Sequence, residues 1–195
     1  LDFRPSGWSF NLGLIVSPIC YIFASTVKKM FKYDDSLDVF GVHCIGGIVG
    51  AIGPIETTPA EEWKLTLDIL LNGVFYGMKH ASRVMKKAGS GSIISMSSVA
   101  GVTGGLAPHA YTAAKHAVVG LTRNLAAELG PYGVRANCVA PYSVATPMVA
   151  HAYLGDHTKI ETTLKMLAEQ SPLKNRPGLA DDVAKACELA HAFET

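Results

Sequence analysis

The sequence has few charged residues and few cysteines, and it contains no G-x-G-x-x-G phosphate loop. Charged residues make up 17% of the 195 residues, whereas soluble domains average about 25%. The 17 lysines and arginines nearly balance the 16 aspartates and glutamates, and this balance argues against a nucleic-acid partner. The seven histidines do not gather at metal-ligand spacing, so we expect no metal site.

The cysteines form no C-x-x-C motif. Each lies in an apolar run: Cys20, Cys44, Cys138 and Cys187. Such residues are usually buried free thiols, as in a reducing compartment. The first residues lack the basic start and the cleavage site of a signal peptide.

The shortage of charge is concentrated in the first 55 residues. Residues 5–27 contain no charged side chain, and neither do residues 39–55. About 20 consecutive apolar residues are enough to span a bilayer as a helix. We therefore expect an apolar helical N-terminal segment, and association with a membrane through residues 5–55 is one of the alternatives that the sequence leaves open.

The rest of the chain alternates between helix and strand. The predicted elements are helix 58–87, strand 92–96, helix 109–129, strand 134–139, a helical region 148–172 and a last helix from Asp181 or Asp182. Strands that alternate with long helices are typical of parallel crossovers. For the first helix we predict Thr58 as the N-cap, with Glu61 completing a capping box.

Three residues, Ser98, Tyr111 and Lys115, suggest chemistry at a carbonyl or hydroxyl group. Tyr111 precedes Lys115 by four positions, so both side chains share one face of the predicted helix. A lysine ammonium beside a phenol favours the phenolate, so we expect the Tyr111 pKa to move from ~10 towards neutrality. Such a phenol can act as the acid in carbonyl reduction or the base in alcohol oxidation. Ser98, at the end of a strand, could hydrogen-bond the substrate oxygen.

From about residue 53 to about residue 190 the chain resembles the short-chain dehydrogenase/reductase family. The resemblance rests on GPIETTPAEEW, NGVFYGMKHASRVM, GSIISMSSVAG, YTAAK, LAAELGPYGVRANCVAP and RPGLADDVAKA. It implies an α/β fold with an incomplete doubly wound (Rossmann-like) parallel sheet. It also implies an oxidoreductase with NAD or NADP as cofactor and a small-molecule alcohol or ketone as substrate. The family commonly forms homo-oligomers by pairing two central helices, here 60–87 and 109–130.

The resemblance assigns a role to each of the three residues. Tyr111 would be the acid/base and would lie against the cofactor. Lys115 would lower the pKa of Tyr111 and hold the nicotinamide ribose. Ser98 would position the substrate oxygen.

The loop after the second predicted strand resembles the family's P-G-x-x-x-T turn. Pro141, Val144 and Thr146 are the cofactor-binding residues that this turn implies, and Val144 and Thr146 would face the nicotinamide amide. Tyr142 stands where the family has glycine, so we expect the backbone to depart from the usual turn.

Two elements of the family are missing from the sequence. The T-G-x-x-x-G-x-G turn that holds the pyrophosphate does not occur, and the nearest glycine cluster, GGIVGAIG at residues 46–53, has a different spacing. The family's active-site asparagine falls on Leu70, two positions before Asn72. Two residues turn a helix by ~200°, so we expect that Asn72 does not replace it. The catalytic half is therefore present and the dinucleotide-binding half is absent.

Residues 12–53 resemble a different family, the ammonium transporters. The resemblance rests on KKMFKYDDSLDVFGVHCIGGIVGAIG, and above all on the D-x-F-G-V-H element at residues 38–43. In that family the histidine, here His43, lines the conduction pore. The segment covers only a small part of such a transporter, and the pore wall needs the rest, so we do not predict transport by this chain alone.

The two resemblances divide the chain into residues 1–53 and residues 54–195. One natural domain would not join a pore helix to the middle of a dehydrogenase sheet, and the first residue is Leu1 rather than methionine. We therefore expect a chimera or a truncated gene model. The first hypothesis is a cytoplasmic NAD(P)-dependent oxidoreductase impaired by truncation. The alternatives are a non-catalytic chimeric remnant at the membrane and, less favoured, an ammonium transporter fragment.

Overall fold

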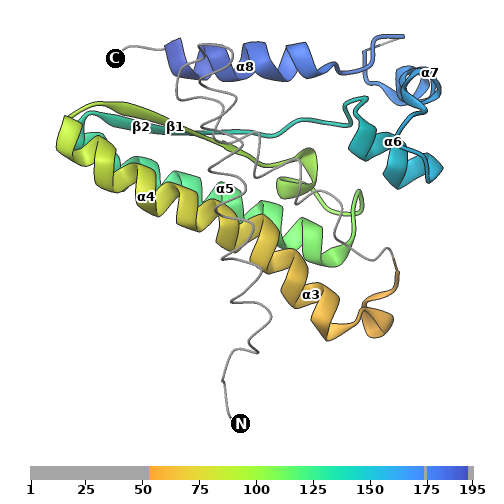
Figure 1. Ribbon diagram of the computed structural model, residues 1–195, viewed down its shortest axis with the longest axis horizontal. Helices are drawn as coiled ribbons and strands as arrows, with labels where there is room; N and C mark the ends of the chain where they lie inside the picture. Colours follow the sequence, from red (N-terminus) through yellow and green to blue (C-terminus); the bar gives the residue numbers. More distant parts are fainter. Residues whose placement is uncertain (1–52, 174, 193–195) are drawn as a thin grey trace.

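Two parallel strands lie between helices in the structure, a computed structural model that describes residues 53–173 and 175–192. The helices and strands are α3 (Ala60–Leu67), α4 (Gly73–Ala88), β1 (Gly91–Met96), α5 (His109–Leu129), β2 (Val134–Val139), α6 (Pro147–Leu154), α7 (Ile160–Gln170) and α8 (Ala180–Ala192). Figure 1 shows α4 and α5 on one face of the strands and α8 on the other. The described residues thus form the predicted α/β arrangement with a partial parallel sheet.

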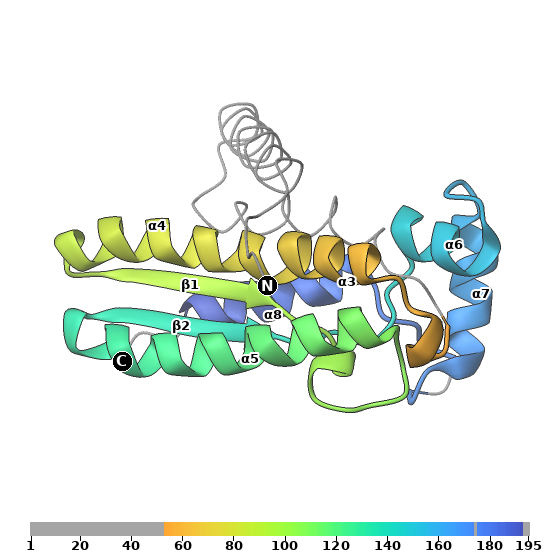
Figure 2. The same cartoon turned by 90° about the horizontal axis from the view of Figure 1, so that it is seen from below.

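The two strands pair in parallel, from Gly91 opposite Val134 to Met96 opposite Val139. Parallel neighbours need a long crossover connection, and α5 supplies it. In the turned view of Figure 2, α4 runs along β1 and α5 runs along β2. The predicted strand 134–139 is confirmed, and β1 begins one residue earlier than predicted.

The core lies between the strands and the α4–α5 face. Its buried cluster consists of Met78, Ile93, Leu125, Leu129 and Val134. Each fully buried side chain of this size contributes roughly 1.5–3 kcal/mol relative to exposure. Because α4, β1, α5 and β2 all contribute to the cluster, its packing fixes the position of α5 along the strands.

The opposite face of β2 holds the end of α8. The Arg135 guanidinium donates to the main-chain oxygen of His191 at 2.6 Å, and the Asn137 amide donates to that of Ala190 at 3.3 Å. The last carbonyls of a helix have no partner within the helix, so these two side chains satisfy them. At the start of α8, the Asp182 carboxylate accepts from the Leu179 amide at 3.0 Å.

The first predicted helix differs from the structure in its start and its continuity. The prediction of Thr58 as N-cap is wrong, because α3 begins at Ala60 after Pro59. A 3-10 turn, Ile55–Thr57, precedes it and brings the Thr58 hydroxyl to the Pro54 oxygen at 3.2 Å. A π-helical turn, Asp68–Asn72, then separates α3 from α4.

The predicted helical region 148–172 forms two helices, α6 and α7. Figure 1 places both beyond the carboxyl ends of the strands. Most of the apolar N-terminal segment, residues 1–52, lies outside the described residues, and so does nearly all of the segment that resembles ammonium transporters. None of the helices within the described part of the chain is long and apolar enough to cross a membrane.

Gly133 allows the chain to turn tightly from α5 into β2, and its replacement gives a test of the fold. Its φ is 70°, and a Cβ at this position would lie 2.5 Å from the Gly89 oxygen. We expect Gly133→Ala to lower the free energy of unfolding by about 2 kcal/mol or more, from backbone conformation and collision together. Urea denaturation measures this change.

Gly77→Ala is the matched control. Gly77 lies inside α4, and a Cβ there meets no atom within 4 Å. Alanine in a helix interior should raise the free energy of unfolding by about 0.5–1 kcal/mol. Equal effects of the two substitutions would contradict the turn geometry described here.

Candidate active site

Ser98 lies where the chain leaves β1. Its backbone is extended, with φ −158° and ψ 163°, and it begins the 3-10 turn Val99–Gly101. Its hydroxyl oxygen accepts a hydrogen bond from the Ala100 amide at 3.2 Å. The same side chain hydrogen-bonds Tyr111, so the end of the strand and the start of α5 meet at this pair.

Tyr111 and Lys115 lie one turn apart near the start of α5. The Lys115 Nζ lies 5.4 Å from the centre of the Tyr111 ring and donates to the Met96 oxygen at 3.2 Å. The structure therefore brings together the three residues that the sequence singled out, at the carboxyl end of β1. Carboxyl ends of parallel strands are the usual place for ligand sites in open α/β sheets.

Burial governs the charge state of this group. It raises the pKa of the Tyr111 phenol, and the hydrogen bond from Ser98 offsets only part of that rise. Lys115 is fully buried, and the loss of solvation lowers the pKa of its amine to about 7. The expected shift of the Tyr111 pKa towards neutrality is therefore wrong for this structure. The reason is that burial disfavours the charged form of both partners.

Cys138 on β2 interacts with Lys115, Ser97 and Thr122. Burial raises the pKa of its thiol, while hydrogen bonds with Thr122 and Ser97 and the charge of Lys115 lower it to a smaller extent. Cys138 and Cys187 are free, as predicted, but only half-buried rather than buried. Cys20 and Cys44 lie outside the described residues.

The residues predicted to contact the cofactor follow β2. The Pro141 oxygen accepts from the Val99 amide at 2.9 Å, which ties this loop to the turn after Ser98. Val144 pairs with Gly178, and the Thr146 hydroxyl oxygen accepts from the Val149 amide at 3.3 Å in the first turn of α6. Tyr142 has a negative φ, so the loop requires no glycine there.

A buried leucine, Leu70, stands where the family has its active-site asparagine. Leu70 is 3% exposed and lies in the π-helical turn Asp68–Asn72. The Asn72 amide donates to the Asp68 carboxylate at 2.7 Å, within the same π-helical turn. That Asn72 does not replace the family's asparagine stays a prediction.

The sequence reasoning missed two residues beside the site, Ser97 and Gly101. The Ser97 hydroxyl donates to the main-chain oxygen of Lys115 at 2.9 Å. A Cβ at Gly101 would lie 2.7 Å from that same oxygen. The available signal was the serine doublet: Ser97 directly precedes Ser98 where the strand ends, and it adds a second hydroxyl beside the one that the sequence singled out.

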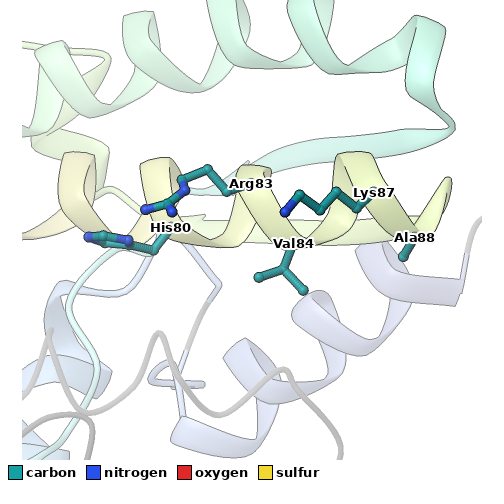
Figure 3. Close-up of a pocket in the computed structure, with 5 residues that line it drawn as sticks. All are labelled: His80, Arg83, Val84, Lys87 and Ala88. Atoms are coloured by element: carbon teal, nitrogen blue, oxygen red, sulfur yellow. The ribbon is translucent and has the colours of Figure 1, made fainter.

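Hollows in the surface do not identify the site by themselves. One lies along α4, where Figure 3 shows the side chains of His80, Arg83, Val84, Lys87 and Ala88. Ser98, Tyr111 and Lys115 take no part in its lining, so we do not assign the chemistry to it. Across residues 53–173 and 175–192, no group of three His, Cys, Asp or Glu residues could hold a metal ion.

Comparison with known proteins identifies the family. A family model described as enoyl-(acyl carrier protein) reductase matches residues 22–190. The (+)-borneol dehydrogenase 2 of Salvia officinalis is 45% identical over 162 residues, covering 78% of this chain and 57% of that protein. The xanthoxin dehydrogenase of Arabidopsis thaliana is 45% identical over 145 residues, covering 72% of this chain and 50% of that protein.

Solved structures give the same result. The crystal structure of levodione reductase superposes with a TM-score of 0.63 and 34% identity, covering 74% of this chain and 56% of that one. The aldohexose dehydrogenase of Thermoplasma acidophilum gives a TM-score of 0.64 and 31% identity, covering 73% and 57%. The chain therefore belongs to the short-chain dehydrogenase/reductase family, and it spans about half the length of the curated relatives it matches.

The family match begins at residue 22, earlier than the predicted boundary at residue 53. It thus includes most of the segment 12–53 that resembles ammonium transporters. That resemblance, the chimera and the truncation remain predictions.

The buried Lys115 predicts how stability depends on pH. The amine has a pKa of about 7 in the folded chain and an ordinary pKa of 10.5. Between these values the unfolded chain binds more protons, so the free energy of unfolding rises with pH. From pH 7 to pH 9 we expect a gain of about 2 kcal/mol from this residue, measured by urea denaturation. Above pH 9 the raised pKa of Cys138 adds the opposite slope.

Lys115→Met isolates the effect, because it removes the titrating amine and keeps an apolar side chain of similar length. The gain between pH 7 and pH 9 should disappear in this variant and persist in Lys185→Met, which changes an exposed lysine of α8. An unaltered slope in Lys115→Met would contradict the assigned charge state.

Proposed function

We propose that this chain is the catalytic part of an NAD(P)-dependent oxidoreductase that interconverts an alcohol and a carbonyl compound. The observation that carries the proposal is the meeting of Ser98, Tyr111 and Lys115 at the carboxyl end of β1, in a chain of this family. Two relatives with 45% identity are named as dehydrogenases. Their names support the reaction class.

In the direction of carbonyl reduction, Tyr111 would supply the proton. Because burial raises the pKa of Tyr111, its phenol holds a proton at neutral pH. That proton can pass to the oxygen of a carbonyl substrate placed against the phenol, which is general acid catalysis. The Ser98 hydroxyl, already directed at Tyr111, would orient the same oxygen by a hydrogen bond.

The residues beside Tyr111 fit one end of a dinucleotide. The Tyr111 phenol is a hydrogen-bonding group of the kind that holds ribose hydroxyls, and by the family resemblance the Lys115 amine, which is covered in this structure, would hold them as well. Val144 and Thr146 follow on the loop after β2. A nicotinamide cofactor, when bound, supplies the hydride donor or acceptor. Among the described residues there is no glycine-rich turn for the pyrophosphate, so the fit extends only to the nicotinamide and its ribose.

The substrate in this proposal is a small alcohol or ketone. The names of the two relatives make borneol and xanthoxin reasonable first probes. A homo-oligomer is part of the proposal, and the exposed Phe75 and Tyr76 on α4 support it as apolar surface on a central helix.

A non-catalytic protein that keeps the fold is the second candidate. Leu70 occupies the asparagine position of the family, and the usual glycine-rich turn is missing from the sequence. Both features remove groups that a working site of this family would use.

Cofactor titration separates the two candidates. We expect NADH or NADPH to bind saturably to the purified full chain, with half-saturation in the range of about 1 μM to 1 mM in which KM values usually lie. Nicotinamide fluorescence follows the binding. A folded chain that binds neither nucleotide would leave the non-catalytic candidate standing.

Replacing Tyr111 tests the acid. We expect Tyr111→Phe to lower kcat for borneol or camphor by about 10²–10⁴-fold, the usual contribution of a positioned acid or base. Tyr76→Phe is the control, since it removes the hydroxyl of an exposed tyrosine on α4. Turnover by Tyr111→Phe equal to that of the control would remove Tyr111 from the mechanism.

A further inference from the structure

Ser97 joins the end of β1 to α5 at Lys115. Its side chain is 2% exposed, and its hydroxyl donates to the main-chain oxygen of Lys115 at 2.9 Å. Carbonyls inside a helix already accept from the amide four residues later. The helix does not need this second bond, so its consequence is to fix where the strand end lies relative to the helix.

Gly101, at the other end of the turn, also lies close to the Lys115 carbonyl. A Cβ at this position would overlap the Ser97 hydroxyl and would lie 2.7 Å from the Lys115 oxygen. The 3-10 turn Val99–Gly101 therefore passes directly over the carbonyl to which Ser97 donates. Ser98, with its hydroxyl at Tyr111, lies between these two contacts in the chain.

Backbone bonds to β2 hold the other side of the same segment. The Ser97 amide donates to the Val139 oxygen at 2.8 Å, and the Val99 amide donates to the Pro141 oxygen at 2.9 Å. Without the Ser97 hydroxyl, the segment would remain tied to the sheet. Its polar tie to the helix turn that carries Lys115 would be lost.

We propose that Ser97 is a positioning residue: its hydroxyl, bonded to the Lys115 carbonyl, sets the place of Ser98 against Tyr111. The expected effect on kcat rests on the proposed function. The expected effect on the position of Ser98 rests on the structure alone. Misplacement of a catalytic group by about 1 Å can cost 10²-fold in rate. The bond from Ser97 to the Lys115 carbonyl can therefore affect the rate without touching the substrate.

The kinetic test uses the full chain and borneol, or any other alcohol on which the unsubstituted protein is active. We expect Ser97→Ala to lower kcat by about tenfold or more, with KM changed by less than about twofold, because the group that is misplaced acts on the transition state. Ser97→Thr retains the hydroxyl and should restore most of the loss. A purely structural role would lower the amount of folded protein without this division between kcat and KM.

Ser95→Ala is the matched control. Ser95 is 3% exposed and lies on the same side of β1, two residues before Ser97. Its replacement removes an equally buried hydroxyl without touching the bond to Lys115. If Ser95→Ala and Ser97→Ala lower kcat equally, the proposal is overturned.

Amide hydrogen exchange gives a second readout that requires no turnover. In Ser97→Ala we expect the amides of Ala100 and Gly101 to exchange about tenfold faster, since the turn loses its tie to α5; in Ser95→Ala they should not. Unchanged exchange in Ser97→Ala would overturn the positioning role even in an active enzyme. Faster exchange in a chain that oxidises no alcohol would support the positioning role and count against the proposed function instead.

Discussion

The burial of Lys115 beneath the end of β1 is the constraint on which the rest of the site depends. A buried amine is costly unless its surroundings supply partners. Here the Met96 oxygen accepts from the amine, and the Tyr111 ring lies one helix turn away. To bury the side chain in this way, α5 must pack closely along β2, and the core around Leu129 and Val134 holds it there.

This packing explains how a helix, a strand end and a loop form one site. The turn after β1 can cross α5 only because Gly101 has no side chain at the Lys115 carbonyl. The loop after β2 joins the same place through the bond between Val99 and Pro141. Three segments that are distant in the sequence therefore meet at the carboxyl ends of two neighbouring strands, where the chemistry of this family is expected.

Much of the fold could be predicted from the sequence where strong local signals agree. The bounds of α5 and β2 match the predicted 109–129 and 134–139. The apolar pattern marks each element, and residues that break regular structure, such as Gly130 and Pro131 after α5, mark where it ends. The start of α3 was not predictable from capping residues, since the Thr58 hydroxyl bonds back to Pro54. We recognised no sequence signal for the π-helical turn Asp68–Asn72, which lies where α3 and α4 meet and, like them, contacts α5.

The sequence by itself determined which residues form the candidate site. The spacing of Tyr111 and Lys115 on one helix and the place of Ser98 at a strand end are local facts, and they survive in any packing of those elements. Only the tertiary structure decided their charge states. Proximity of a lysine alone would lower the pKa of the phenol, but burial raises the pKa of Tyr111 and lowers that of Lys115 to about 7. Burial depends on every element that covers a side chain, and the sequence pattern around one motif cannot give it.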